Sequence, residues 1–336
     1  MSTAARFNAP QPSDPASWDL AASEQMNRSA IAGGTLADLA DRDSRIVVLT
    51  ADLKYSSRTV EFERRHPERF FNVGIAEQHM VTMAAGMATF GYIPYVATFA
   101  SYASLLCAEQ LRTDLAYPGL PVRVLAHHAG ISLGFYGTSH HATEDLGLLR
   151  SIANMTVVCP CDAASTSRAL VDTLDATGPV YFRVGRGREP DVYDPGAPGF
   201  EVGRLTRLRD GEDLTIVSNG ITVHAALGAA EILAREGTRA GVLDAHTVRP
   251  FDAAGLCAAA SATGRLLVAE EHNVFGGVAS ACADALVDGG VGGVRMARAG
   301  MPADEYALIA PPTTLYRHYG LDADGLAASA RRLLAA

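Results

Sequence analysis

Positively charged residues are too few and too scattered in this sequence for a nucleic-acid binder. The 336 residues include 28 Lys and Arg against 37 Asp and Glu, which gives a formal net charge of −9, and the basic residues form no run. Proteins that bind nucleic acids concentrate basic residues in a patch that contacts the phosphates. We therefore expect no nucleic-acid partner.

Cysteine is also scarce, and its five copies lie mostly within apolar stretches (Cys107, Cys159, Cys161, Cys257 and Cys282). An odd number in a chain of this length is typical of a reducing compartment rather than of a disulfide framework. The sequence therefore favours a cytoplasmic location. Cys159-Pro-Cys161 has no second cysteine pair, so neither a metal site nor redox chemistry is expected there.

Secretory and membrane-spanning patterns are lacking as well. The start, MSTAARFNAPQPSDPASWD, has no basic segment followed by an apolar block, and residues 1–18 are predicted to form a flexible tail. Residues 79–108 carry no Asp, Glu, Lys or Arg, but Gly91-Tyr-Ile-Pro94 interrupts them. A membrane helix needs about 20 consecutive apolar residues. We interpret this stretch as two buried elements joined by a turn, and we expect no membrane association.

What the sequence does contain is an alternation of helix-like and strand-like segments. Short β-branched runs such as RIVVLTADL and VRVLAHH are typical of central parallel strands, and helical patterns separate them. Residues 188–203 are rich in Pro and Gly without periodicity and are predicted to be a linker. The sequence therefore predicts two doubly wound α/β domains, at residues 19–187 and, smaller, at 204–336.

Two clusters in the first domain have residue types suited to binding a heterocycle. NVGIAEQHM, residues 72–80, places Glu77 at the start of an apolar helix, where a carboxylate can exchange a proton with a ligand nitrogen. In TFASY, Phe99 and Tyr102 follow a strand and could form an apolar wall against a flat ring. Taken alone, these residues also fit a helix-terminal carboxylate and ordinary core packing. The Walker phosphate loop and G-x-G-x-x-G are absent.

Histidines and arginines gather at the ends of two later strands. Four histidines surround a Gly-rich loop (His127, His128, His140 and His141). Loops at the carboxyl ends of parallel strands hold ligands, and imidazoles there suit proton transfer or contacts to phosphate and hydroxyl oxygens. A purely structural histidine cluster is the alternative, and a zinc site lacks partners at a matching spacing. In FRVGRGRE, the three arginines could grip a phosphate or form a solvated linker edge (Arg183, Arg186 and Arg188).

Taken in order, these strings resemble the carboxyl-terminal half of transketolase and of deoxyxylulose phosphate synthase. The resemblance begins near Arg28 and rests on TADL, NVGIAEQH, TFASY, GTSHH, FRVGRG, DAHTVRPFD and VAEEHNVFGG. It implies a pyrimidine-binding domain followed by a transketolase C-terminal domain. It also implies that thiamine diphosphate binds between subunits.

The resemblance implies specific contacts to that cofactor. Glu77 matches the family's glutamate that hydrogen-bonds the aminopyrimidine ring nitrogen, and the resemblance implies that it is the central catalytic residue. Phe99 with Tyr102 is similar to the aromatic wall beside the pyrimidine. Asp52 and Leu53 of TADL fall among the cofactor-binding positions.

Phosphorylated sugars are the implied substrates. His128 and His140 match the two catalytic histidines of the substrate channel. Further substrate-binding positions are Arg28, Ser56 and Arg186, which resemble the sugar-phosphate clamp. The family usually has acid-Asp-Gly-Pro-Thr-His in the loop, whereas this chain has Phe-Tyr136-Gly-Thr-Ser-His. Tyr136 replaces an aspartate that contacts a sugar hydroxyl, so we expect a non-standard donor or acceptor preference.

The family's G-D-G motif with a later Asn, which holds the cofactor diphosphate through Mg²⁺ or Ca²⁺, is missing from the sequence. No metal ligand is therefore assigned to this chain. The resemblance implies an amino-terminal transketolase subunit that carries G-D-G and the Asn, joined with this chain in a heterotetramer. The expected reaction is transfer of a two-carbon ketol unit from a ketose phosphate to an aldehyde, only in the presence of that partner.

Two other functions stay open. The β subunit of the decarboxylating component of a 2-oxo-acid dehydrogenase has similar length and domain order, but its substrates need no phosphate clamp. A non-catalytic regulatory subunit could retain the same fold. The presence of Glu77, His128 and His140 argues against the regulatory role.

Overall fold

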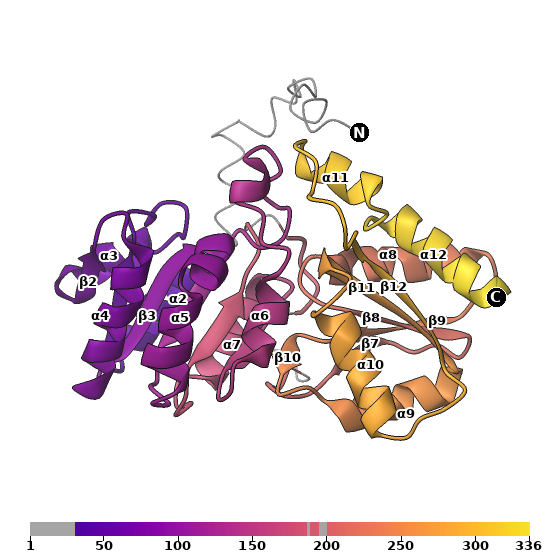
Figure 1. Ribbon diagram of the computed structural model, residues 1–336, viewed down its shortest axis with the longest axis horizontal. Coiled ribbons are helices and arrows are strands. Elements are labelled where there is room, and N and C mark those ends of the chain that lie inside the picture. Colours follow the sequence, from indigo (N-terminus) through magenta and orange to yellow (C-terminus); the bar gives the residue numbers. More distant parts are fainter. Residues whose placement is uncertain (1–30, 187–188, 195–199) are drawn as a thin grey trace.

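The computed structural model describes residues 31–186, 189–194 and 200–336. Within them the chain forms two α/β units, each built on its own sheet, that lie side by side (Figure 1). Arg28, the predicted tail at 1–18 and parts of the predicted linker lie outside the described residues. None of the helices in the described ranges is long and apolar enough to cross a membrane.

The first sheet has the strand order β10-β5-β6-β4-β3-β1-β2 in the described chain. Its strands are β1 (Ile46–Thr50), β2 (Phe70–Asn72), β3 (Ile93–Phe99), β4 (Arg123–His127), β5 (Thr156–Val158), β6 (Val180–Arg183) and β10 (Thr247–Arg249). All pairs are parallel except that between β10 and β5. Strand β10 comes from the second half of the chain but belongs to the first sheet. No single position in the sequence therefore separates the residues of the two sheets.

Helices cover both faces of this sheet. They are α2 (Ile31–Ala40), α3 (Val60–Arg65), η4 (Pro67–Arg69), α4 (Glu77–Thr89), η5 (Tyr102–Leu106), α5 (Ala108–Gln110), η6 (Leu111–Ala116), η7 (Gly137–Ser139), α6 (Asp145–Ser151) and α7 (Ala163–Asp172). Alternate residues of β1 explain the two layers. Ile46 and Val48 pack in one apolar cluster with α2 and α7, whereas Val47 and Leu49 pack in another with α4 and η6. This two-sided burial is what a continuous apolar strand predicts.

The second sheet has the order β12-β11-β8-β9-β7 in the described chain. Its strands are β7 (Thr206–Arg209), β8 (Leu214–Ser218), β9 (Ala240–Asp244), β11 (Arg265–Asn273) and β12 (Arg295–Met301). Helices α9 (Ala253–Thr263) and α10 (Val278–Asp288) pack on one face, and α8 (Thr222–Arg235), α11 (Pro312–His318) and α12 (Ala323–Ala335) on the other. The predicted α/β class with two doubly wound domains is confirmed.

The helical segment between Ser101 and Ala116 is irregular. Wide π turns occupy η5 and η6, and three α-helical residues lie between them. Within η5 the Ser104 hydroxyl donates to the Ala100 carbonyl at 2.7 Å, a side-chain bond that competes with regular helical bonding. Short π segments are common at functional sites, and η5 begins at Tyr102.

Candidate active site

The predicted site residues of the first unit lie at the carboxyl ends of three adjacent strands. Asp52 follows β1, Phe99 ends β3, and His128 follows β4. Strands β1, β3 and β4 are neighbours in the parallel sheet, so their carboxyl ends meet at one edge. That edge is where open α/β sheets bind ligands.

A hydrogen-bonded turn fixes the approach to Glu77. The Asn72 side-chain oxygen accepts from the backbone N–H of Asp52 at 3.0 Å and of Gly74 at 3.1 Å, and its amide nitrogen donates to the Asp52 carboxylate at 2.9 Å. Gly74 has a φ of +75°, a conformation that favours glycine, and Asp52 has a φ of +61°. The Asp52 region and the start of α4 are thereby tied together.

Glu77 is the first residue of α4 and is only 6% exposed. Its carboxylate has no hydrogen-bond partner among the described residues, although buried carboxylates normally have one. Burial, together with the nearby Glu77 charge, raises the pKa of the Cys107 thiol to about 12. Burial and the same charge also raise the pKa of Tyr102. Glu77 is thus a buried acid close to Tyr102 with an unused acceptor.

Phe99 lies at the centre of an aromatic cluster. Its ring contacts His127, His128, His140 and Tyr102 edge-on, with centroid separations of 5.0, 5.1, 5.5 and 5.6 Å respectively. The Tyr102 hydroxyl is 3.0 Å from His140 Nε2, and the Ser139 hydroxyl is 2.9 Å from His140 Nδ1. The structure thereby brings together four residues that the sequence assigned to cofactor and substrate (Phe99, Tyr102, His128 and His140).

The two adjacent histidines are held as an uncharged pair. His127 Nδ1 and His128 Nδ1 are 2.7 Å apart, so one nitrogen must donate and the other must accept. Burial lowers the pKa of His127 to about 3, and it lowers the pKa of His128 as well, with His127 and Arg186 adding to the effect. Burial also lowers the pKa of His140. At neutral pH these imidazoles can therefore both donate and accept protons.

A pocket beside this cluster contains two predicted substrate residues. Ser56 and Arg186 line a small cavity of about 50 Å³, together with Arg58 and His127. Arg58 was not identified from the sequence. The sequence feature that could have identified Arg58 is a basic residue two positions after Ser56, in a segment that follows a strand. It has a φ of +60°, and both arginines act on the pKa of His128.

Arg183 does not line this cavity but ends in a buried salt bridge. Its guanidinium donates to the Asp145 carboxylate at 2.8 and 3.1 Å, and both side chains are almost wholly buried. It also donates to the carbonyls of Ala142 and Glu271 at 2.9 and 2.8 Å. The alternative that Arg183 grips a phosphate is therefore wrong. Neighbouring carboxylate and carbonyl groups already use most of its donors.

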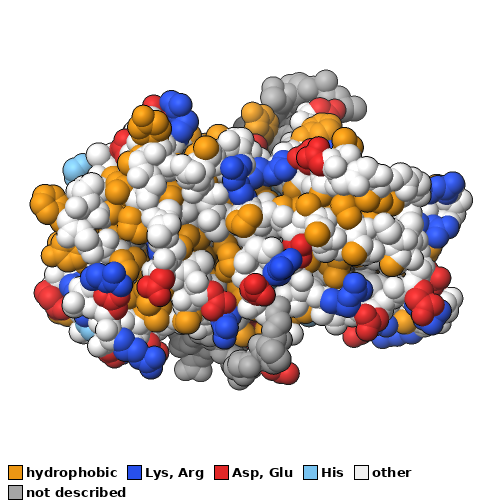
Figure 2. All heavy atoms as spheres, turned by 90° about the horizontal axis from the view of Figure 1, so that it is seen from below, with side chains coloured by type: hydrophobic (Ala, Val, Ile, Leu, Met, Phe, Trp, Pro, Cys, Tyr) orange, Lys and Arg blue, Asp and Glu red, His pale blue; other side chains and the backbone are white. Residues whose placement is uncertain are grey.

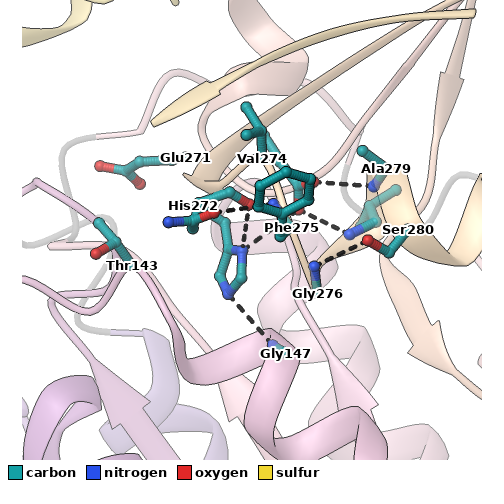
Figure 3. Close-up of polar contacts among 12 residues, drawn as sticks. Thr143, Gly147, Glu271, His272, Val274, Phe275, Gly276, Ala279 and Ser280 are labelled. Carbon is teal, nitrogen blue, oxygen red and sulfur yellow. Dashed lines mark hydrogen bonds and ion pairs between the residues drawn. The ribbon is translucent and has the colours of Figure 1, made fainter. Parts of the chain in front are cut away.

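The string VAEEHNVFGG packs against the first unit (Figure 3). His272 Nε2 accepts from the Gly147 N–H at 3.2 Å, and its Nδ1 donates to the Asn273 carbonyl at 2.8 Å. Glu270 accepts from the N–H groups of Val278 and Ala279 at 2.7 and 2.9 Å, which caps α10. This string therefore anchors helices of both units.

Comparison with known proteins identifies both units. Residues 24–190 match the pyrimidine binding domain of transketolase, and residues 203–326 match the transketolase C-terminal domain. The chain belongs to the transketolase family. The resemblance noted in the sequence is thus confirmed, and family membership implies dependence on thiamine diphosphate.

Relatives named as single subunits align over most of their length. The chain is 36% identical to one subunit of the apulose-4-phosphate transketolase of Phocaeicola vulgatus, over 88% of this chain and 94% of that protein. It is 40% identical to the 6-deoxy-6-sulfo-D-fructose transketolase subunit SqwH of a Clostridium species, over 75% of this chain and 78% of that protein. A solved split gene transketolase, described as an inactive beta4 tetramer, shares 39% identity with a TM-score of 0.84, covering 92% of this chain and 98% of that chain.

The described residues of this transketolase chain fit one end of the cofactor. The unpartnered Glu77 carboxylate and the partly exposed Phe99 ring suit an aminopyrimidine. Within the described ranges, no group of three or more His, Cys, Asp or Glu residues could hold a metal ion. These residues therefore fit the pyrimidine ring of the cofactor.

Acid should weaken this chain through its buried neutral histidines. His127 has a folded-state pKa of about 3 against about 6.5 when unfolded, so stability is lost as the pH falls below about 6.5. We expect the replacement His127→Gln to remove about 1 kcal/mol of the loss between pH 7.5 and 5.5, measured by urea unfolding at each pH. Replacing the exposed His224 with Gln is the control, and an equal effect there would contradict the assignment.

Proposed function

We propose that this chain is the carboxyl-terminal subunit of a two-component transketolase that depends on thiamine diphosphate. It would transfer a two-carbon ketol unit from a ketose phosphate to an aldehyde. The observation that carries this proposal is the buried Glu77 carboxylate without a hydrogen-bond partner in the described chain, near the Phe99 cluster. An acid in that state is suited to a nitrogen heterocycle.

Each predicted residue has a place in this mechanism. Glu77 would bind the ring nitrogen of the aminopyrimidine and hold the proton there, while Phe99 and Tyr102 would pack against the ring. Asp52 and Leu53 lie at the same edge, next to the turn formed by Asn72. Thiamine diphosphate, when bound, supplies the carbon nucleophile and stabilises the carbanion.

The neutral histidines would donate protons to the sugar oxygens and accept protons from the sugar hydroxyls. His140 forms hydrogen bonds with Tyr102 and Ser139 through its two ring nitrogens, one donating and the other accepting, so its orientation is fixed. The His128 ring contacts Phe99, and the Arg186 charge acts on the pKa of His128, so this imidazole would exchange hydroxyl protons nearer the phosphate. Neutral imidazoles near a sugar can pass protons in both directions.

The pocket with Ser56, Arg58 and Arg186 is the proposed phosphate clamp. Two guanidinium groups and a hydroxyl suit a phosphate dianion. Each planar guanidinium can donate two parallel hydrogen bonds to phosphate oxygens and so fix the orientation of the phosphate. Arg28, which lies outside the described residues, is proposed as a further member of this clamp. The clamp is the feature that favours transketolase chemistry over the β subunit of a 2-oxo-acid dehydrogenase.

We propose that an amino-terminal subunit covers the exposed apolar side chains around Glu77. Ile75 is 84% exposed just before it, and Leu105 and Leu106 are 55% and 47% exposed in η5. Figure 2 shows apolar side chains exposed on one face of the molecule, over both units. Large exposed apolar patches mark contact sites. The partner would supply the G-D-G and Asn residues with Mg²⁺ or Ca²⁺ in a heterotetramer.

Two finer points belong to the same proposal. Tyr136 is 55% exposed, and its ring lies 4.8 Å from that of His140, where it would meet the sugar in place of a carboxylate. We therefore propose a substrate preference that differs from that of pentose-phosphate transketolase. The cysteines are all free thiols, four of them buried, which favours a cytoplasmic location.

Reconstitution tests the proposed reaction. Neither this chain nor its amino-terminal partner alone is expected to show turnover, because each lacks part of the cofactor site. The mixture with thiamine diphosphate and Mg²⁺ should transfer ketol units from ketose phosphates. Unphosphorylated ketoses serve as the control and should react at least about tenfold less efficiently, because the clamp would be empty. Decarboxylation of an added 2-oxo acid without ketol transfer would instead support the dehydrogenase alternative.

A further inference from the structure

We propose that Glu271, from the C-terminal unit, is a positioning residue that holds residues 130–142, here named the substrate loop, in its active geometry. This inference rests on the proposed function, because the loop carries Tyr136 and His140. Glu271 lies in β11, and its side chain is only 4% exposed. The residue belongs to a unit that contributes none of the assigned catalytic groups.

The first observation is that one carboxylate oxygen of Glu271 holds the start of the loop. Oε1 accepts from the Ile131 N–H at 2.8 Å and from the Tyr316 hydroxyl at 2.6 Å. A Cβ atom at Gly130 would lie 2.1 Å from the Glu271 carboxyl carbon. Gly130 also has a φ of +59°. The backbone at Gly130 therefore adopts this conformation in direct contact with the carboxylate.

The second observation is that the backbone of Glu271 is tied to the other end of the loop. Arg183 donates from one nitrogen to both the Glu271 carbonyl and the Ala142 carbonyl. Gly130 and Ala142 exchange two backbone hydrogen bonds, at 3.2 and 2.9 Å, which close the loop at its base. Both ends of the loop are thus anchored to one residue of the second sheet.

The middle of the loop also rests on the C-terminal unit. The Ala310 N–H donates to the Gly134 carbonyl at 3.3 Å, and a Cβ atom at Gly134 would lie 2.1 Å from the Ala310 carbonyl oxygen. The middle of the loop therefore packs against the segment just before α11. A loop supported at its start, middle and end can keep His140 beside Tyr102.

The charge state of Glu271 determines which residue can replace it with the least change. Burial raises its pKa to about 7, although Arg183, Tyr316 and the Ile131 N–H act in the opposite direction and Glu189 adds to the rise. The neutral acid is therefore present near neutral pH. Glutamine resembles it and keeps a carbonyl oxygen that can accept the same two hydrogen bonds.

Hydrogen exchange of the full-length chain tests the anchoring without any substrate. In Glu271→Ala we expect amides 130–142 to exchange at least about tenfold faster than in wild type, with Glu271→Gln close to wild type. Glu270→Gln is the matched control, because it alters the neighbouring buried carboxylate that caps α10 and does not contact the loop. Unchanged exchange of the loop in Glu271→Ala would overturn the proposal. If that variant does not fold, Tyr316→Phe should speed exchange of the same amides at least about twofold, and no change there would overturn it.

Kinetics of the reconstituted enzyme test the positioning role. Glu271→Ala should lower kcat/KM for the ketose donor by about tenfold or more, while the affinity for thiamine diphosphate changes less than about twofold, because Glu77 lies outside the loop. Equal losses in donor efficiency and cofactor affinity would overturn positioning in favour of general damage. Absence of ketol transfer by the wild-type complex would instead refute the proposed function, and the exchange experiment would still decide whether Glu271 holds the loop.

Discussion

Replacement of Glu77 by alanine is expected to lower kcat of the reconstituted enzyme by at least about 100-fold. A positioned acid or base contributes about 10²–10⁴-fold to a rate. Glu77 is a buried carboxyl group at this edge of the sheet whose oxygens have no hydrogen-bond partner among the described residues. Steady-state kinetics with saturating cofactor would measure the effect and separate it from weaker cofactor binding.

Two further variants sharpen this test. Glu77→Gln keeps the shape but cannot hold a proton as an acid does, so it should resemble alanine in kcat. Glu109→Ala changes an exposed carboxylate of α5 that pairs with Arg112, and its kcat should stay within about twofold of wild type. Unchanged turnover in Glu77→Ala would refute the catalytic role and favour the non-catalytic regulatory alternative.

Removal of the buried Arg183 charge should destabilise the chain by about 3–5 kcal/mol, because Asp145 would keep an uncompensated buried charge. In Arg183→Met, the Asp145 carboxylate would lose the hydrogen bonds from Arg183. Of the side-chain donors described here, it would keep the Tyr181 hydroxyl, at 3.2 Å. The carbonyls of Ala142 and Glu271 would lose a shared donor as well. Urea unfolding at pH 7 would measure the change.

The exposed pair of Arg45 and Asp43 provides the matched control. Its nitrogen–oxygen distance of 2.7 Å is close to that of the buried pair, but the Arg45 side chain is 54% exposed. Arg45→Met should cost far less stability than Arg183→Met, since water screens such pairs. A double replacement, Arg183→Met with Asp145→Leu, should recover part of the lost stability by removing both charges. Similar losses for the exposed and buried single variants would contradict the burial argument.

Much of the fold could be predicted from local pattern alone. IVVLT is apolar at every position but one and is buried on both faces, so it indicated a central parallel strand. The shortest strands are too short to show such an apolar run. Thr247–Arg249 has three residues, and nothing in its sequence shows that it pairs with β5 of the first sheet. The π turns of η5 also depend on local hydrogen bonds that periodicity does not reveal.

The candidate site was predictable to a similar extent. Strings with unusual composition, such as the histidine loop, predicted which residues gather around Phe99, and their rings do contact one another. Arg58 was missed, and Arg183 was left open between a phosphate contact and a solvated linker edge, because adjacent positions in sequence do not show which way a side chain points. Arg183 ends a strand and points into the interface between units, whereas Arg186, three residues later, lines the pocket.

The sequence by itself determined the class of fold, the family and the set of residues suited to a cofactor, because these follow from hydrophobic pattern and from short strings of adjacent residues. Tertiary structure alone decided that His127 and His128 form an uncharged pair, that Arg183 holds a buried carboxylate, and that Glu271 contacts the substrate loop. Burial and partners set charge and orientation. For Glu271 and Ile131 those partners are 140 positions apart in the chain, so only folding brings them together.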